Sequence, residues 1–489
     1  MLRKMSFVCG ILLVAATSCT KNFDKINTNP NSPEYINSDY LMSEVILSTA
    51  YAYQTDAFKE RPAAAGRYIT LVQTTTNDLF TWGAVSWDDI YSRLSVGQQL
   101  FNQAEANGEK QYLAIAKIMK AFNFGYLTDL YGDVPFTQAL QSKTGGITQP
   151  EYDQQQKIYP ALLQMLEEAN ELLRNNPGAI NADQDVLFAG KTLQWRKFAN
   201  ALRLRILLRC AKQYANAYTD MQAMLNDADR YPLPAANADD ASVKYIEGTA
   251  ANSWPGSTLT MIDFDFTKTK ASKELVDNLT AFNDPRLAVW VAPVATTTGS
   301  TVNKNTYVGV PNAIEDPRSY NGGETHQSTL GALFRKGSGD MIKASMITYT
   351  EVCFILAEAL QAGKITLSGK TAEDMYNLGI QSSMTFYGVQ SQATANGYYS
   401  QAAVKYNGTL EQLITQKWMA MIFKGAEGWF DHRRTGYPHF TIGPLAVKNI
   451  VPLRYRYPTS ELANNGTNYN NAVKVFGADD EYTLMWYLK

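Results

Sequence analysis

Apolar residues recur at helical spacing in seven long segments of this 489-residue chain. In one segment, Trp195, Phe198 and Leu202 fall on one side, because residues three and four positions apart share a helix face. The pattern predicts helices over about 38–60, 111–130, 157–175, 193–215, 345–362, 371–385 and 410–424. Long amphipathic helices joined by short turns favour a mainly α fold, built as a tetratricopeptide-like scaffold. The strict tetratricopeptide pattern is absent from the sequence, so its repeats are degenerate.

Residues 231–344 break this pattern, because Pro, Gly, Thr, Asn and aromatic residues replace the helical period. We expect a large irregular lobe there, with short strands at 289–291 and 307–310. Residues 425–489 are again expected to be rich in loops, which is where binding residues concentrate on a rigid scaffold. The expected organisation is one domain over 38–489, with its scaffold at about 38–230 and 345–424, the lobe at about 231–344, and the loop-rich part at 425–489.

The N-terminus has the anatomy of an export signal. Arg3 and Lys4 precede an apolar run, which is followed by Ala16-Thr17-Ser18-Cys19. The run is shorter than the ~20 apolar residues of a permanent span, and a Cys after small residues resembles a bacterial lipobox. We therefore predict a lipoprotein signal peptide at 1–18, a lipid anchor on Cys19 and a polar strap over 19–37. The alternative is an ordinary signal cut near Ala16, with Cys19 a plain thiol.

Composition excludes some partners. The chain has 44 basic and 46 acidic residues and a pI near 6.1, whereas nucleic-acid binding needs a basic footprint. No later segment is apolar enough to span a bilayer, so we expect a soluble globular body. Only 18% of residues are charged while 29 are Tyr, which suits contact with neutral polar ligands. The predicted partners are thus a polar nutrient and the membrane that holds the anchor, and no nucleic acid.

Signatures of catalysis and of metal binding are largely missing. The chain lacks G-x-S-x-G and H-E-x-x-H motifs and holds three His, so we expect no cofactor. Calcium held by scattered carboxylates stays open. Once the signal is cut and Cys19 is acylated, Cys210 and Cys353 remain, and their apolar helical settings predict buried free thiols, with a disulfide as the alternative.

A hydrolase stays open as well, because 46 acidic residues always allow a pair of carboxylates to be chosen. Asp88-Asp89, Asp263-Phe264-Asp265 and Asp479-Asp480-Glu481 are the evident clusters. Solvated or capping roles are the simpler interpretation of each, and the cleft geometry that glycosidases need is not visible in a sequence.

Sugars offer apolar faces for aromatic rings and hydroxyl edges for Asn, Asp, Gln or Arg. Three irregular segments combine both kinds of side chain: 74–83, 252–256 and 316–323. The candidate ligand-binding residues are Asn77, Asp78, Phe80 and Trp82 in the first, Trp254 in the second, and Arg318 and Tyr320 in the third. The alternative for each Trp is packing onto its own scaffold, since Trp is highly buried on average.

Several ordered motifs over nearly the whole chain resemble those of the SusD-like (SusD/RagB) family of Bacteroidetes outer-membrane lipoproteins. The matching stretches are Phe23-Asp24-Lys25-Ile26-Asn27-Thr28-Asn29-Pro30-Asn31, Ala121-Phe122-Asn123-Phe124-Gly125-Tyr126-Leu127-Thr128-Asp129-Leu130-Tyr131-Gly132-Asp133-Val134-Pro135-Phe136, Trp195 to Arg205, Asn283-Asp284-Pro285-Arg286-Leu287, Tyr349 to Ala359, Gly425 to Gly436 and Pro452 to Pro458. One departure is His432, where the family more often has an apolar residue.

The resemblance implies a non-enzymatic protein of the cell surface. Such proteins form lids over a SusC-like TonB-dependent transporter and capture nutrients, usually glycans and sometimes peptides. It also implies a tetratricopeptide-like scaffold that supports an irregular ligand-binding lobe. We expect the motifs themselves to hold the scaffold, with Arg203 or Arg205 pairing with Glu358 or Glu427.

Overall fold

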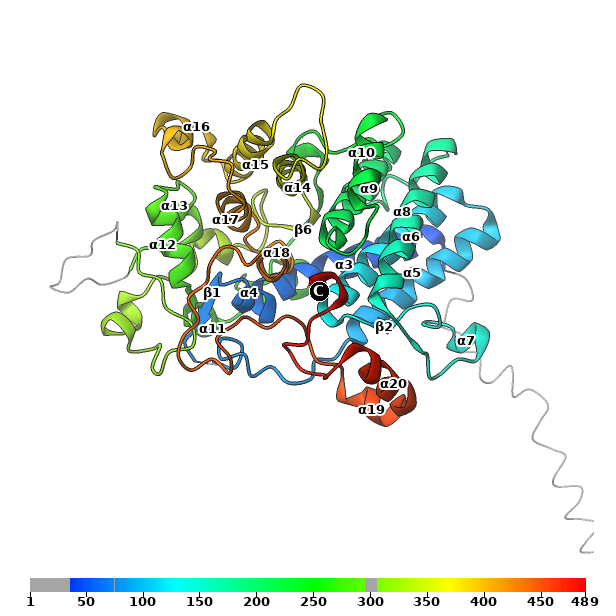
Figure 1. The fold of residues 1–489 in the computed structure, drawn as a ribbon, viewed down its shortest axis with the longest axis horizontal. Coiled ribbons are helices and arrows are strands. Elements are labelled where there is room, and N and C mark those ends of the chain that lie inside the picture. Colours follow the sequence, from blue (N-terminus) through cyan, green and yellow to red (C-terminus); the bar gives the residue numbers. More distant parts are fainter. Residues whose placement is uncertain (1–35, 74, 177, 295–305) are drawn as a thin grey trace, which may run out of the picture.

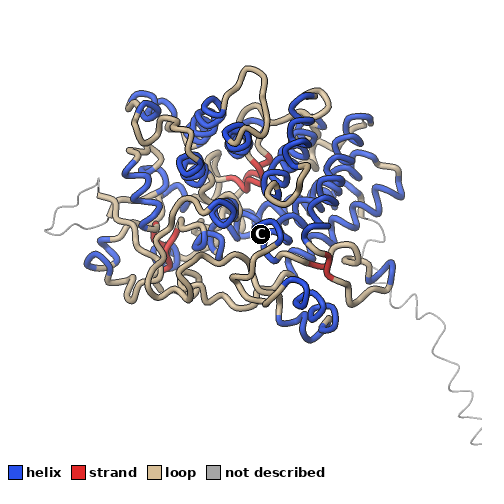
Figure 2. Tube along the Cα trace, in the orientation of Figure 1, coloured by secondary structure: helices blue, strands red, loops and turns tan. Residues whose placement is uncertain are grey.

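The computed structural model describes residues 36–489, except 74, 177 and 295–305. Long helices fill the upper and right parts of the molecule in Figure 1, and loops run along its lower side (Figure 2). The helices are α3 Ser38–Lys59, α4 Arg61–Ala65, α5 Asp88–Asn107, α6 Lys110–Tyr131, α7 Ser142–Gly145, α8 Gln155–Asn175, α9 Thr192–Cys210, α10 Ala217–Asn226, α11 Asp263–Lys268, α12 Lys273–Ala281, α13 Leu287–Trp290, α14 Tyr349–Gln361, α15 Ala372–Phe386, α16 Gln390–Ala395, α17 Leu410–Ala420, α18 Glu427–Thr435, α19 Thr459–Asn464 and α20 Gly466–Phe476. The strands are β1 Ile69–Leu71, β2 Val134–Pro135, β3 Tyr152–Asp153, β4 Ala241–Lys244, β5 Thr269–Ala271 and β6 Lys343–Ile347.

The first half of the scaffold is a row of packed helices. Helix α5 ends at Gly108, whose φ of 71° stops the helix and turns the chain into α6. Helix α6 packs on α5 and α8, and α8 packs on α9. Nearly every residue of α6 from Leu113 to Tyr131 is buried, which is expected of a helix covered on all sides.

The second half of the scaffold is built on α14. Helices α15 and α17 pack on it, and its contact with α9 joins the two halves. Helix α15 starts at a capping box, in which Thr371 and Asp374 each accept a hydrogen bond from the other's backbone N–H. The mainly α fold predicted from the helical period is thereby confirmed.

Strands add short links between distant segments. The described residues contain three two-stranded antiparallel sheets, β1–β5, β2–β3 and β4–β6. In the first, Ile69 pairs with Ala271 and Leu71 with Thr269, so this ladder attaches the lobe to the end of the first helices. The β4–β6 ladder lies directly before α14 and fixes where that helix begins.

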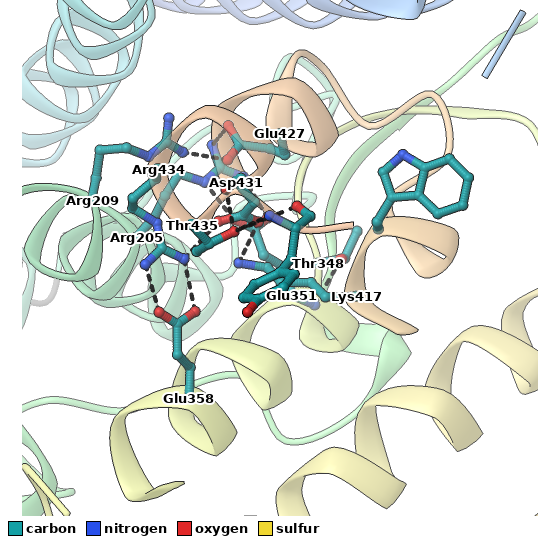
Figure 3. Close-up of polar contacts among 12 residues, drawn as sticks. Arg205, Arg209, Thr348, Glu351, Glu358, Lys417, Glu427, Asp431, Arg434 and Thr435 are labelled. Carbon is teal, nitrogen blue, oxygen red and sulfur yellow. Dashed lines mark hydrogen bonds and ion pairs between the residues drawn. The ribbon is translucent and has the colours of Figure 1, made fainter. Parts of the chain in front are cut away.

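The centre of the molecule holds a network of buried charges (Figure 3). The Arg205 guanidinium on α9 donates to both carboxylate oxygens of Glu351 on α14, each at 2.6 Å. The next arginine of α9, Arg209, pairs with Glu427 on α18 and, at 3.1 Å, with Asp129 on α6. Burial raises the pKa of Glu427, but Arg205 and Arg209 outweigh it and hold that pKa below its usual value.

The same network extends to α17 and α18. Asp431 lies between Lys417, at 2.7 Å, and Arg434, at 2.9 Å, and Arg434 also grips Glu358 at 2.5 Å. One of the ion pairs expected from sequence is present: Arg205 lies 3.8 Å from Glu427. Glu358, the other expected acceptor, pairs with Arg434 instead. Arg203 instead pairs with Glu167 on α8.

Several element predictions need correction. The strand expected at 289–291 is helix α13 up to Trp290, and Val291 forms one isolated bridge with Leu330. The strand expected at 307–310 is likewise reduced to a bridge between Val310 and Ser272. The helix expected from 345 starts at Tyr349, because 343–347 pair with β4. Short apolar runs do not distinguish strand from helix by themselves.

The loop-rich C-terminal part contains more helix than expected. Helices α18, α19 and α20 all lie in it, and their short lengths hid the helical period. Cys210 and Cys353 are buried free thiols, as expected. No helix of the described residues is long and apolar enough to cross a bilayer. The signal and anchor residues, Cys19 included, lie outside the described residues.

The network generates a prediction about stability. Replacing Glu351 with Gln (E351Q) should lower the free energy of unfolding by ~3–5 kcal/mol, because it leaves the Arg205 charge buried with a weaker partner. Urea unfolding at pH 7 measures the change.

The matched control is Lys273→Ala, which removes an ion pair to Asp277 that is about half exposed on both sides. That variant should stay within ~0.5 kcal/mol of the parent. Equal small effects for the two variants would contradict a structural role for the buried pair.

Candidate functional site

Three distant loop segments meet along the lower side of the molecule in Figure 1, and we call this surface the loop face: residues 75–86, 311–326 and 437–452. Hydrogen bonds join them in pairs. The Asn312 amide donates to the Asp78 carboxylate at 2.7 Å. The Val447 N–H donates to Leu79, and the Leu445 N–H donates to Ala313, both at 3.0 Å. Predicted binding residues from two segments are thus brought to one face.

Asp78 fastens the first segment from inside. Its carboxylate also accepts from the Leu71 N–H at 2.7 Å, and the residue is 1% exposed. Burial raises the pKa of Asp78 to about 7, against the hydrogen bonds and the nearby Arg67, which lower it. The Asp78 carboxylate therefore holds the segment in place and is not accessible to a ligand. This corrects the ligand-binding role predicted for Asp78.

Phe80 and Trp82 also point inward. Phe80 adopts φ of 61° and is buried, with the Arg67 guanidinium 5.8 Å from its ring centre. Trp82 is 6% exposed, and its indole N–H donates to the Asn77 carbonyl at 3.0 Å. The indole packs edge-to-face against the rings of Trp429 and Tyr455, with ring centres 5.5 and 5.6 Å away. Both rings therefore pack the scaffold, which corrects their predicted stacking role, while the Asn77 side chain is half-buried.

Trp254 lies in the core under the lobe. It is 3% exposed and sits between Phe58, Tyr245 and Phe334, with ring centres 5.2–5.9 Å away. Its backbone N–H donates to the Gly337 carbonyl at 2.8 Å. This ring too has no face open to a ligand, so the structure favours the alternative stated for both Trp residues.

The third predicted segment is the one that lines an open depression. Its cavity measures about 600 Å³ and lies over residues 316–325. Arg318 is exposed and donates through Nε to Glu324 at 2.9 Å; Tyr320, just beyond the lining, is half-buried. The buried Gln327 amide holds the loop by donating to the carbonyls of Pro317 and Tyr320, both at 2.8 Å. The lining residues are Asp316, Arg318, Ser319, Gly322, Gly323, Glu324 and Thr325.

Charge dominates this depression. Partial burial raises the pKa of Glu324, yet hydrogen bonds from Lys268 and Arg318 outweigh it and leave the pKa below its usual value. Hydrogen bonds from Ser319 likewise lower the pKa of Asp316. Both carboxylates are therefore ionised at neutral pH, beside two cations. The depression offers polar groups in fixed positions and no buried aromatic floor.

Sequence reasoning found Arg318 but missed Glu324 and Lys268. Glu324 follows the Gly322-Gly323 turn, whose φ values of 91° and 108° bring it back beside Arg318. The sequence did hold one indication of this contact: a Gly-Gly pair lies between the basic Arg318 and the acidic Glu324. Lys268, at the end of α11, has no such signal, because β5 and the lobe decide its position.

Metal ligands are not clustered here. In the described part of the chain, no group of three or more His, Cys, Asp or Glu side chains is arranged to hold a metal ion. The expectation of no cofactor, and the alternative of a structural calcium, stay predictions.

The protein is thus a mainly helical scaffold whose loops gather at one face, where an open polar depression lies. The family model for starch-binding proteins that associate with the outer membrane matches residues 30–458. The chain belongs to this SusD-like family. No curated protein matches the chain.

Solved structures agree with the fold. A SusD homologue of Bacteroides fragilis NCTC 9343 is 23% identical with a TM-score of 0.79, over 93% of this chain and 100% of that one. A Bacteroides vulgatus ATCC 8482 protein, whose role in nutrient binding at the outer membrane is itself inferred, is 25% identical with the same TM-score and the same coverage. A chitin-binding SusD homologue of Flavobacterium johnsoniae is 20% identical, with a TM-score of 0.75 over 93% and 99%.

Burial of the Trp82 and Trp254 indoles predicts that both residues stabilise the fold and do not bind ligand. Trp82→Ala and Trp254→Ala should each lower the free energy of unfolding by ~3–5 kcal/mol through loss of packing. Urea unfolding measures the loss, and Phe264→Ala, at a ring that is 53% exposed, is the control. An unchanged stability with weakened ligand binding would instead restore the stacking role.

The buried Asp78 predicts a pH dependence of stability. Between about pH 4 and 7 the folded state keeps the Asp78 proton while the unfolded chain releases it, so stability falls as pH rises. Asp78→Asn should remove this slope, which amounts to roughly 1.4 kcal/mol per pH unit. Unfolding curves of both proteins at pH 4, 5.5 and 7 test it, and parallel profiles would show that Asp78 is ionised throughout.

Proposed function

We propose that this protein is a non-catalytic, lipid-anchored surface protein that binds a nutrient oligomer and delivers it to a SusC-like TonB-dependent transporter of the outer membrane. A glycan is our first choice of nutrient. The observation that carries the proposal is the open depression at 316–325, held in shape by Gln327 on a family-typical scaffold. The anchor on Cys19 follows from the N-terminal pattern alone.

Several features support a role for the depression in binding. Fixed donors and acceptors suit the hydroxyl edges of a sugar, and Tyr320 lies beside them with part of its ring accessible. A relative of this fold is a chitin-binding protein. A preformed polar loop lowers the cost of ordering the site when ligand arrives.

The acid–base properties of the depression support a non-catalytic role. A general acid needs a pKa near the working pH. Asp316 and Glu324 both have pKa values below their usual range, so neither carries a proton at neutral pH. Hydrolysis through this pair is therefore disfavoured.

A peptide is the second candidate ligand. Asp316, Arg318 and Glu324 give the depression a charged lining without aromatic residues, and Lys268 pairs with Glu324 beside it. Such groups pair with the charged side chains and termini of peptides. Titration with chito- and malto-oligosaccharides on one side and with charged oligopeptides on the other decides between the two.

Substitutions at the depression test the site. Arg318→Ala and Tyr320→Ala should each weaken binding of the true nutrient by about 10-fold or more, as expected for loss of a charged hydrogen bond or a ring contact. Calorimetric titration gives the affinities, and Arg174→Ala, at an exposed ion pair of α8, is the control. Wild-type affinity in both site variants would place the nutrient elsewhere.

The transporter role has its own test. We expect the acylated protein, extracted gently from outer membrane, to bring down a TonB-dependent transporter in equal amount, as read by mass spectrometry. Cys19→Ala should abolish acylation and release the protein from the membrane fraction. Recovery of the acylated protein without a barrel would contradict delivery, even if nutrient binding persists.

A further inference from the structure

A second cavity lies on the helical scaffold, apart from the loop face. It measures about 580 Å³ and is formed by α5, α6 and the 136–144 segment that follows β2. We call it the scaffold cavity. None of its lining residues belongs to the loop face, so it is a separate place where a small molecule could be held.

The 136–144 segment is fixed in place by Asp153 on β3. The Asp153 carboxylate accepts hydrogen bonds from the Phe136 N–H at 3.2 Å, the Thr137 N–H at 2.7 Å and the Thr137 hydroxyl at 2.9 Å. Further along the segment, the Gln141 amide donates to the Thr137 carbonyl at 2.6 Å. This wall of the cavity is therefore ordered before a ligand arrives, which lowers the cost of binding.

A lysine without an ion pair lines the cavity. Lys120 on α6 donates to the Gln98 carboxamide oxygen at 2.5 Å, and its ammonium lies 4.8 Å from the ring centre of Phe101. An ammonium has three donors, and this is its one hydrogen bond within the described residues. Burial, together with the nearby Lys117, lowers the pKa of Lys120 to about 8. Two donors of a partly desolvated cation are left for a ligand.

The charges of the lining cancel. The charged residues that line the cavity are Lys120 and Glu105. Glu105 is exposed near the end of α5 and forms no ion pair with Lys120 within the described residues. With one basic and one acidic group, the lining favours neither an anion nor a cation. A neutral ligand with several hydrogen-bonding groups suits it best.

Carboxamides supply further hydrogen-bonding groups. The exposed Asn102 side chain accepts from the Gln98 amide at 2.6 Å through its oxygen. Its own amide N–H groups have no partner within the described residues. Gln141 uses an N–H on the Thr137 carbonyl, while its side-chain oxygen accepts no hydrogen bond from the described part of the chain. The lining therefore offers both donors and acceptors, which a hydroxyl group can use together.

An aromatic surface lies beside these groups. Phe136 is half-buried in the lining, and its ring packs edge-to-face with Phe124 at 4.8 Å between ring centres. Leu140 adds to the apolar part of the lining. A flat ring next to hydrogen-bonding side chains matches a sugar, which has an apolar C–H face and hydroxyl edges. The lining of the depression at 316–325 has no aromatic residue.

We propose that the scaffold cavity is a second binding site, which takes a neutral mono- or disaccharide. Lys120 and Asn102 donate hydrogen bonds to its hydroxyl and ring oxygens. Gln141 accepts from its hydroxyl groups, and Phe136 packs against its C–H face. The site depends on the lining of this cavity alone, so it acts whether or not the depression on the loop face binds the nutrient.

The experiment is calorimetric titration of the mature protein with four neutral disaccharides, each added separately: maltose, cellobiose, lactose and N,N′-diacetylchitobiose. They differ in linkage and substituents, and none carries a charge. We expect at least one of them to bind with a Kd of roughly 1 mM or tighter. Absence of binding by all four at tens of millimolar would overturn the proposal.

Variants connect the binding to the cavity. Lys120→Met should weaken the tightest of these disaccharides by about 10-fold or more, the effect of losing a charge-assisted hydrogen bond. Asn102→Ala changes an exposed side chain and should weaken it by about 3- to 10-fold, which keeps the test valid if Lys120→Met does not fold. Lys110→Met, at an exposed lysine that begins the same helix, is the control and should bind like the parent. Parent-like affinity in both cavity variants would overturn the assignment.

A crystal of the mature protein soaked with the tightest disaccharide gives the position directly. We expect density for the sugar against the Phe136 ring and within hydrogen-bond distance of the Lys120 ammonium. Density at 316–325 alone would overturn the second site while supporting the proposed role of the depression. Density in the scaffold cavity alone would support the second site without supporting that role.

Discussion

Charges buried at the centre of the scaffold must be paired, and this requirement fixes how the two halves meet. Arg205 and Arg209 leave α9 on the side that faces α14 and α18, where Glu351 and Glu427 receive them. Removing such groups from water costs several kcal/mol per ion, and only close hydrogen-bonded geometry offsets it. Displacing any of these helices would strand a charge. The network therefore fixes the relative positions of the helices more than it adds net stability to the fold.

The segments of the loop face are held on this rigid centre in two different ways. The 75–86 and 437–452 segments are held in place by Asp78, by backbone hydrogen bonds and by the inward-facing Trp82. The aromatic side chains of Phe80 and Trp82 therefore hold loops in place and are not accessible to a ligand. The 316–325 segment is held by the Gln327 amide instead, which leaves Arg318 and its neighbours free to face solvent. Polar contacts at a preformed loop carry the proposed binding.

Local patterns predicted most of the long helices, although α5 was not among the predicted segments. The positions of side chains in irregular segments could not be predicted in this way. The period of Trp195, Phe198 and Leu202 predicted α9, since one face of a long helix must be buried. The same reasoning could not place Trp254, because an indole in an irregular segment gives no indication of which side its neighbours cover. The strand expected at 289–291 became α13 for a related reason, as three apolar residues fit either period.

The sequence alone determined the class of fold and the family motifs, and it alone supports the predicted export signal before Cys19, because each depends on residues close together in the chain. Tertiary structure alone decided which candidate residues are accessible. Asp78, Trp82 and Trp254 are buried by segments more than 50 residues away, whereas Arg318 is left exposed. Burial and juxtaposition are properties of long-range packing, and no local pattern encodes them.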